Sequence, residues 1–190
     1  VLSTKKSAEF ILDTESKISF VFSFMAILVL TLGVFVFYLQ TTRYIAEIRY
    51  NMAFAAGNSF NKIEERIAQA INLNPQQERF WRDLSSLYTL QAQAQFNRQD
   101  IEAEERNQKA TEYIANAVAS SKKATEINPE NVANWQTRAQ TYQQLLGISR
   151  GAFEWAVETY KEALKLEPDN PYLLVELGKV YMTSASMTED

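Results

Sequence analysis

The sequence contains no cysteine and no histidine. Without cysteine there is no disulfide framework and no thiolate metal site. Without histidine the chain lacks the commonest general base and the commonest metal ligand at neutral pH. The five glycines are scattered along the chain, so no Gly-rich phosphate loop is present. We therefore expect no catalytic residue, no cofactor and no metal site in these 190 residues.

Turn-forming residues and excess charge are also scarce. Five Gly and four Pro are too few for an all-β or loop-rich protein. The net charge of −4 is mild, and no basic tract is long enough to bind nucleic acid. The composition therefore disfavours an all-β fold and a nucleic-acid partner, and the helical pattern of the chain after residue 39 predicts an all-α protein.

One long apolar run stands near the N-terminus. Residues 18–39 carry no charge, and about 20 apolar residues span the hydrocarbon core of a bilayer. Lys17 and Arg43 bracket the run, while Tyr38 and Tyr44 stand where an interfacial aromatic belt would lie. The run predicts a transmembrane helix, preceded by a juxtamembrane segment at residues 1–17.

Two alternatives compete with a transmembrane anchor. A buried core helix of this length needs a larger domain around it than the remaining chain can supply. A cleaved signal peptide has an apolar region of about 7–15 residues with a small-x-small site close behind. Here the nearest such site, Ala53-Phe54-Ala55, lies 14 positions past Leu39. We therefore favour an uncleaved anchor that uses the lipid bilayer as its partner.

The charges that flank the apolar run bear on its orientation. Lys5, Lys6 and Lys17 precede it, and Arg43 and Arg49 follow it closely. Three positive charges before the run against two after it favour, by one charge, a cytoplasmic location for the N-terminal side. The C-terminal region is then expected on the extracytoplasmic side.

Beyond residue 43 two short patterns alternate. In the first, an Ala is followed by an apolar residue three positions later and by Pro five positions later. It occurs at Ala70-Ile-Asn-Leu-Asn-Pro75, Ala124-Thr-Glu-Ile-Asn-Pro129 and Ala163-Leu-Lys-Leu-Glu-Pro168. Ala allows a close helix–helix approach, and Pro ends the helix and starts the turn.

The second pattern follows each Pro with large, large, small and aromatic residues at three- and four-residue steps, which form one helix face. The three copies are Trp81-x-x-Leu84-Ser85-x-x-Tyr88, Trp135-x-x-Arg138-Ala139-x-x-Tyr142 and Leu174-x-x-Leu177-Gly178-x-x-Tyr181. The small residue marks the place where the partner helix crosses.

With these patterns, the chain from about Arg49 resembles the tetratricopeptide repeat (TPR) family, whose 34-residue unit reads W-x₂-L-G-x₂-Y, then A-x₃-F, then P. Ala156-x-x-x-Tyr160 matches the second-helix part, and Ala117-x-x-x-Ser121 and Ile63-x-x-x-Ile67 match it more loosely. The resemblance implies an α-solenoid of helix hairpins that mediates protein–protein interaction. We expect one repeat domain at residues 43–190, with units at about 43–75, 76–129 and 130–168 and an incomplete unit at 169–190.

The repeat departs from its 34-residue period at two places, and its first and last units are irregular. Pro75 and Pro129 are 54 positions apart, and the extra residues between Tyr88 and Ala117 predict one elongated hairpin. Pro129 and Pro168 are 39 positions apart, and the glycines at 147 and 151 predict a widened turn. The first helix of the first unit is expected to continue the transmembrane helix and to end at Gly57-Asn58. The last unit has one helix only, so its apolar face is expected to lack a cover.

Three groups of residues invite a functional interpretation but have a simpler one. Trp81 and Trp135 are expected to be core wedges between helices, because of their register in the repeat. Glu102, Glu104 and Glu105 are expected on a solvated helix face, and Ser120-Ser121-Lys122-Lys123 is expected on the surface.

The surface predicted to bind a partner is the concave face, which is formed by the first helix of each pair. Its expected residues are Arg79, Arg82, Asp83, Ser86, Gln136, Thr137, Gln140, Gln143, Gln144, Tyr172, Glu176 and Lys179. We expect a protein or peptide partner here. TPR proteins that bind chaperone C-terminal carboxylates use a Lys/Asn clamp, whereas the matching positions here are rich in Gln, so that ligand is disfavoured. An ordinary solvated surface is the competing interpretation.

The junction between the apolar run and the first repeat is similar to the last transmembrane helix and appended repeats of bacterial O-antigen ligase- or polymerase-like proteins. The similarity rests on Phe35-Val-Phe-Tyr38 running through Arg43-Tyr-Ile-Ala46, and on the region from Asn134-Trp135 to Asn170-Pro171. It implies the C-terminal part of a polytopic protein of cell-envelope glycan assembly, in the bacterial cytoplasmic membrane. Because the sequence begins with Val1 and ends within a repeat, we expect a piece of a longer chain. The alternative is a single-pass TPR assembly factor for envelope, pilus or cytochrome maturation.

Overall fold

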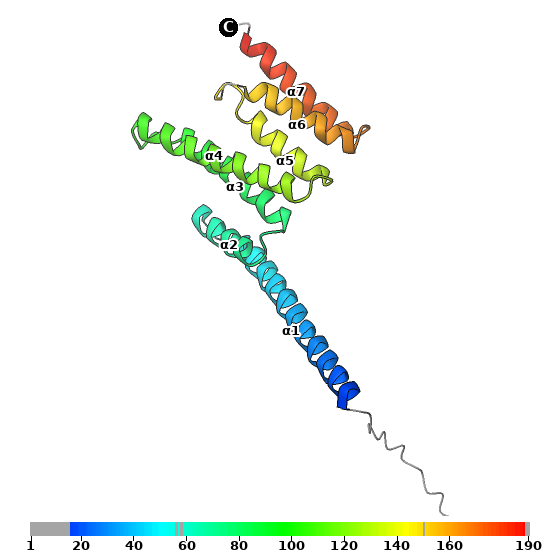
Figure 1. The fold of residues 1–190 in the computed structure, drawn as a ribbon. Coiled ribbons are helices and arrows are strands. Elements are labelled where there is room, and N and C mark those ends of the chain that lie inside the picture. The colour runs from blue at the N-terminus through cyan, green and yellow to red at the C-terminus, as the bar shows by residue number, and fades with distance from the viewer. Residues whose placement is uncertain (1–15, 56, 58, 150, 189–190) are drawn as a thin grey trace, which may run out of the picture. The chain divides into compact units, whose positions relative to one another are not determined.

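The computed structural model describes residues 16–55, 57, 59–149 and 151–188. Within these residues the chain forms seven α-helices and no strand (Figure 1), which confirms the all-α prediction. The helices are α1 (Ser16–Ala53), α2 (Phe60–Leu73), α3 (Glu78–Phe96), α4 (Ala103–Ile127), α5 (Val132–Gln143), α6 (Ala152–Leu166) and α7 (Pro171–Thr188). The chain divides into two compact units, one up to Thr42 and one from Arg43 onward. Lys5 and Lys6, which entered the orientation argument, lie outside the described residues.

The first unit is the apolar part of α1. Its large side chains are exposed along its length, up to 73% for Phe37. The hydroxyls of Thr31 and Thr41 donate to the carbonyls of Ile27 and Phe37, at 2.8 and 2.9 Å, so these polar groups are satisfied within the helix itself. From Ser19 onward the helix is long and apolar enough, by length and composition, to cross a membrane.

The helix α1 continues without a break into the second unit, as expected from the sequence. Its last turns supply Ala46, Tyr50 and Ala53 to a core shared with α2 and α3. It therefore serves as the first helix of the first repeat. It ends at Ala53, earlier than the predicted Gly57-Asn58. Gly57 has φ +81° and lies in the turn, and Asn58 lies outside the described residues.

The three Ala-to-Pro turns are built alike. Ala70, Ala124 and Ala163 are all fully buried, as the pattern predicts for close helix contacts. The first backbone N–H after each helix donates to the carbonyl of that Ala. The three bonds are Asn74 to Ala70 (2.9 Å), Asn128 to Ala124 (3.2 Å) and Glu167 to Ala163 (3.1 Å). Each bond satisfies a carbonyl that the end of the helix would otherwise leave open.

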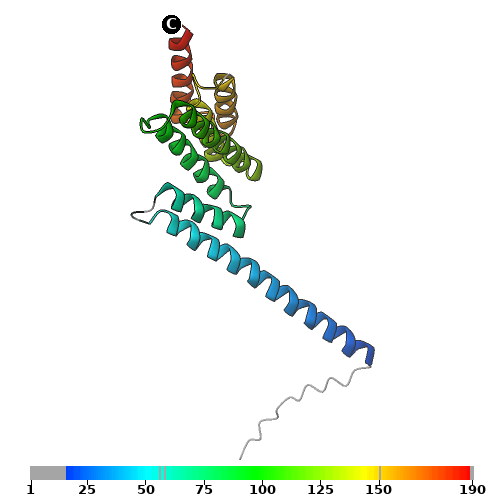
Figure 2. The same ribbon diagram turned by 90° about the vertical axis from the view of Figure 1, so that its left-hand side faces the viewer.

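The elongated hairpin and the widened turn are both present. The helices α3 and α4 have 19 and 25 residues, against 12 and 15 for α5 and α6. The paired helices α3 and α4 lie side by side in both views (Figures 1 and 2). In the turn from α5 to α6, Gly147 and Gly151 have φ +77° and +83°, a left-handed conformation that favours glycine.

The tryptophans are less buried than their register predicts. Trp81 and Trp135 pack against the two apolar cores but remain half-buried. Each indole N–H donates to the carbonyl of the preceding turn proline, at 2.9 Å to Pro75 and 2.6 Å to Pro129. The polar edge of the ring therefore lies at the surface, where it ties the helix to the turn before it.

The surface position predicted for Ser120-Ser121-Lys122-Lys123 is wrong for its serines. Ser120 and Ser121 are 5% and 0% exposed, and only the lysines face solvent. The Ser121 hydroxyl donates to the Val118 carbonyl at 3.0 Å, so its own helix satisfies it. A small side chain bonded in this way fits a close helix contact as Ala does.

The helix α7 exposes an apolar face, as predicted. Leu174 is 51% exposed, and Tyr181, whose ring meets Phe153 edge-on, is 45% exposed. A Cβ added at Gly178 would meet no atom within 4 Å. In the two preceding units the equivalent small residues, Ser85 and Ala139, are fully buried.

Candidate binding groove

The first helices of the second and third pairs, α3 and α5, and the single helix of the last unit, α7, line a groove of about 380 Å³. Its lining residues are Ser86, Thr89, Leu90, Gln93, Thr137, Gln140, Thr141, Gln143, Gln144 and Glu176. Six of the twelve residues predicted from the sequence are among them: Ser86, Thr137, Gln140, Gln143, Gln144 and Glu176. That they bind a partner stays a prediction.

Glutamine side chains bridge the helices of the groove. Gln93 Nε2 donates to Gln144 Oε1 at 2.7 Å, which joins α3 to the end of α5. Gln140 Nε2 donates to the Tyr172 hydroxyl at 2.8 Å, which joins α5 to α7. These bonds fix the orientation of the amides, so the groove surface is organised before any ligand arrives.

Of the described residues that line the groove, Glu176 is the one with a charge, and it is 9% exposed. Its carboxylate accepts from Lys179 Nζ at 2.7 Å and from Gln143 Nε2 at 3.3 Å. Gln143 in turn accepts from the Tyr160 hydroxyl at 2.6 Å. Burial, and then the negative charge of Glu176, raise the pKa of Tyr160, so this phenol remains a neutral donor. The chain Tyr160–Gln143–Glu176–Lys179 thus neutralises the carboxylate at the α7 side of the groove.

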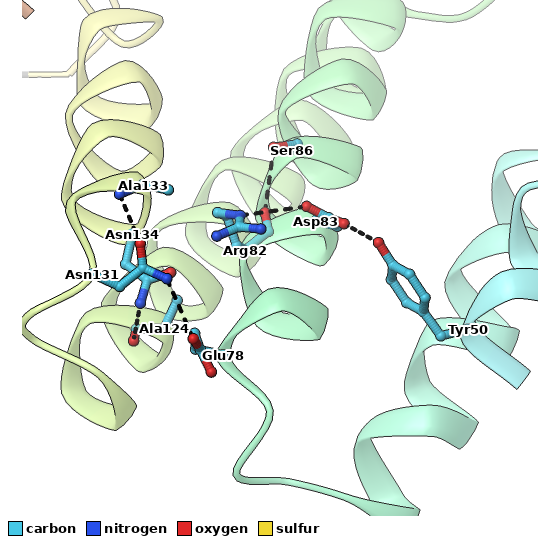
Figure 3. Close-up of polar contacts among 9 residues, drawn as sticks. All are labelled: Tyr50, Glu78, Arg82, Asp83, Ser86, Ala124, Asn131, Ala133 and Asn134. Carbon is cyan, nitrogen blue, oxygen red and sulfur yellow. Dashed lines mark hydrogen bonds and ion pairs between the residues drawn. The ribbon is translucent and has the colours of Figure 1, made fainter. Parts of the chain in front are cut away.

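Three of the predicted residues lie outside the groove lining, in the contact between the first and second repeats. Arg79 forms an ion pair with Glu47, and its guanidinium lies 4.4 Å from the ring centre of Tyr50. The Tyr50 hydroxyl donates to Asp83, and Arg82 lies 3.7 Å from the same carboxylate (Figure 3). Burial, with the hydrogen bond to Asp83, raises the pKa of Tyr50. These charges are already paired within the protein.

The remaining predicted residues stand at the rim or beside it. Tyr172 and Lys179 reach the groove only through their bonds to Gln140 and Glu176. Gln136 is half-buried on α5 and is not part of the lining.

The sequence pattern did not predict four of the lining residues: Thr89, Leu90, Gln93 and Thr141. Three of them follow Ser86 at helical steps of three, four and seven, so the face of α3 simply continues into the extension. The repeat pattern stops at Tyr88, which is why it did not include them. Thr141 lies one turn after Thr137 on α5.

A second polar joint connects α3 with the turn before α5 (Figure 3). The Glu78 carboxylate accepts from Asn131 at 3.3 Å, as Figure 3 shows. It also accepts from Asn128 at 3.2 Å. The fully buried Asn134 donates to the carbonyls of Ala124 and Asn128, at 3.1 and 3.0 Å. Burial alone would raise the pKa of Glu78, but hydrogen bonds from its own backbone N–H and from the two asparagines lower it.

The acidic cluster of Glu102, Glu104 and Glu105 stands at the start of α4, where Glu105 bonds Lys109 at 2.7 Å. In the part of the chain that the structure describes, no three acidic side chains are arranged to hold a metal ion.

Comparison with known proteins agrees with this architecture. Residues 148–184 match the family model of the TPR repeat, which covers α6 and most of α7. No curated protein matches the chain in sequence.

Solved structures share the fold of the repeat region. The TPR domain of OM64 from Arabidopsis has a TM-score of 0.53 at 18% identity, over 73% of this chain and 96% of that one. The first TPR domain of Spaghetti (RPAP3), solved bound to the HSP90 peptide SRMEEVD, has a TM-score of 0.51 at 14% identity, over 78% of this chain and 96% of that one. The repeat region therefore has the TPR fold, which in general serves as a non-enzymatic scaffold for interaction.

Proposed function

We propose that this chain is a membrane-anchored TPR scaffold that binds an extended segment of a partner protein in the groove of α3, α5 and α7. The observation that carries the proposal is the groove itself. The first helices of successive pairs line it, and solenoid repeats present their binding surface there. The Spaghetti (RPAP3) domain, which shares the fold, is bound to a peptide and so supports a peptide as the class of ligand.

The anchor in this proposal is residues 18–39. Support comes from the absence of charge in this run and from the exposure of its large apolar side chains, which suit lipid rather than water. The membrane would be the bacterial cytoplasmic membrane, with the repeats on its extracytoplasmic side. Tethering holds the groove at the membrane and so raises the local concentration of any membrane-bound partner.

The parent protein in this proposal is an O-antigen ligase- or polymerase-like polytopic protein, whose repeats would position an acceptor or partner. The continuity of α1 from the apolar run into the first repeat is the feature that supports it. Reading the coding sequence upstream of Val1 tests this part separately. Further apolar spans are expected, whereas an initiating Met directly upstream would favour the single-pass assembly factor.

The binding proposal is tested by site-directed photocrosslinking. Because the chain has no cysteine, a single Cys can be placed at will and labelled with a photoreactive group. Gln140→Cys places the label in the groove, and Lys161→Cys on the exposed side of α6 is the matched control. We expect a discrete protein adduct in native membranes from Gln140→Cys and not from Lys161→Cys. Equal labelling at the two positions would contradict a groove-specific partner.

A further inference from the structure

The two departures from the 34-residue period meet at one place in the fold. The extension of the second repeat supplies Ala92 and Phe96 from α3 and Ile114 from α4. The widened turn after α5 supplies Leu145 and Ile148. Together with Ala117, these five residues form the apolar wall of a narrow pocket of about 30 Å³. A repeat of standard length would lack most of this wall.

The pocket adjoins the groove. Thr89, Gln93, Thr141 and Gln144 line both the groove and the pocket. A chain lying in the groove therefore passes the mouth of the pocket and can insert one side chain. The narrow apolar wall fits an aliphatic side chain, whereas a charged one would lose its hydration there without compensation.

The glutamines at the mouth of the pocket suit the backbone of such a chain. The bond from Gln93 Nε2 to Gln144 Oε1 uses one atom of each amide. Among the described residues no hydrogen bond reaches the other side-chain atoms of this pair, Gln93 Oε1 and Gln144 Nε2. One free acceptor beside one free donor matches the N–H and C=O that an extended peptide presents.

The charge of the groove argues against an acidic ligand. Among the described residues that line the groove there is no Lys or Arg, and the one charged group is the Glu176 carboxylate. A ligand carboxylate would give up hydration there without meeting a cation among the described lining residues, because Lys179 is already paired with Glu176. The acidic peptide of the Spaghetti (RPAP3) complex is therefore the wrong chemistry for this groove.

We infer that the groove recognises an internal, extended segment of its partner that inserts one aliphatic side chain into the pocket of Phe96, Ile114, Leu145 and Ile148 and is uncharged on either side of it. This inference rests on the proposed function, because it names the class of ligand for the same groove.

The test is a selection of peptides on the full chain held in lipid nanodiscs. The probe is a phage-displayed library of random nine-residue peptides, fused at both ends so that no free carboxylate is present. We expect the selected peptides to share one Val, Ile or Leu and to be depleted in Asp and Glu. Replacing that residue by Lys in a synthetic copy should weaken binding at least tenfold.

Two substitutions of exposed apolar residues locate the binding site. Ile148→Lys places a charge at the pocket, and Ile148 is 53% exposed, so folding should survive. Leu166→Lys is the matched control, on a residue that is 40% exposed outside the groove. We expect at least tenfold weaker binding for Ile148→Lys and no change for Leu166→Lys, with equal helical content by circular dichroism.

The failures of the inference and of the proposed function are distinguishable. If acidic peptides are selected and lose binding in Gln140→Glu, or if peptides without an aliphatic residue are selected and lose binding in Gln140→Arg, the inference is overturned while the groove function stands. If no peptide is selected, or if Gln140→Arg and Ile148→Lys both leave binding unchanged, the groove does not bind peptides and both ideas fail.

Discussion

At the scale of single residues, the turn prolines and the tryptophans act together. The Trp135 indole covers the apolar core on one side and donates to the Pro129 carbonyl on the other. Arg138 lies over the same ring, with its guanidinium carbon 5.7 Å from the ring centre. A half-buried ring with a hydrogen-bonded edge thus links the core of one repeat to the turn that begins it.

Trp135→Ala should therefore destabilise the repeat domain. A fully buried Trp would cost about 3–5 kcal/mol, and we expect about 2 kcal/mol here because the ring is half-buried. Trp135→Phe keeps most of the packing and should cost about 1 kcal/mol, the usual contribution of one hydrogen bond. Chemical denaturation of the full chain in detergent measures both. An unchanged midpoint for Trp135→Ala would mean that the ring contributes nothing to the core.

Glu78 makes the joint between the second and third repeats sensitive to acid. Its pKa is lowered below the usual 4.5 in the folded protein. The stability that it contributes is therefore complete above 4.5 and is lost as the pH falls through the lower, folded-state pKa. We expect Glu78→Gln to lose less stability than the wild type when unfolding is followed from pH 6 to pH 3. A wild type and variant with parallel pH profiles would contradict this role.

At the scale of helices and turns, the sequence predicted the boundaries best where a backbone rule acts. The helix α2 runs from Phe60 to Leu73, between the turn at Gly57 and the turn at Pro75, where the Ala-to-Pro pattern predicts the end of a helix. The spacing of the prolines likewise predicted the long α3–α4 hairpin. The buried serines at 120 and 121 were missed, because side-chain polarity alone does not reveal a hydroxyl bonded within its own helix.

The widened turn after α5 depends on its glycines. Gly151 has φ +83°, and an alanine there should cost about 1 kcal/mol because an L side chain is strained in this conformation. Gly178, in the interior of α7, is the matched control, since a Cβ there meets nothing within 4 Å. Gly178→Ala should stabilise the helix by about 0.5–1 kcal/mol. Thermal unfolding of the two variants should therefore shift in opposite directions, and a shared direction would contradict the assignment of the turn.

At the scale of the whole molecule, the repeat pattern predicted which helices would line the groove but not its full extent. The positions of Ser86, Gln140 and Glu176 in the groove lining were predicted from their place in the repeat alone. Arg79 and Asp83 have the same register, but they bind Glu47 and Tyr50 of α1. The pattern within one helix does not show which residues a neighbouring helix will contact, so these pairings could not be predicted. Thr89, Leu90 and Gln93 stand in the extension, where the 34-residue template has no counterpart.

Deleting residues 18–39 should release a soluble, largely helical protein. The run supplies most of the apolar surface that suits lipid, while the remaining helices are amphipathic and of mixed charge. The measurement is sedimentation of membranes after a high-salt wash, with circular dichroism on the supernatant. A deleted protein that still pellets would mean that another part of the chain holds it to the membrane.

The central claim is that one chain joins a membrane anchor to a groove that binds protein segments. Flotation of lipid vesicles with a fluorescent peptide selected on the full chain tests it most directly. We predict that the peptide floats with vesicles that carry the full chain. It should stay at the bottom with vesicles that carry Gln140→Arg, and with vesicles mixed with the chain that lacks residues 18–39. Equal flotation of the peptide with the wild type and Gln140→Arg would contradict the groove, and flotation with the deleted chain would contradict the anchor.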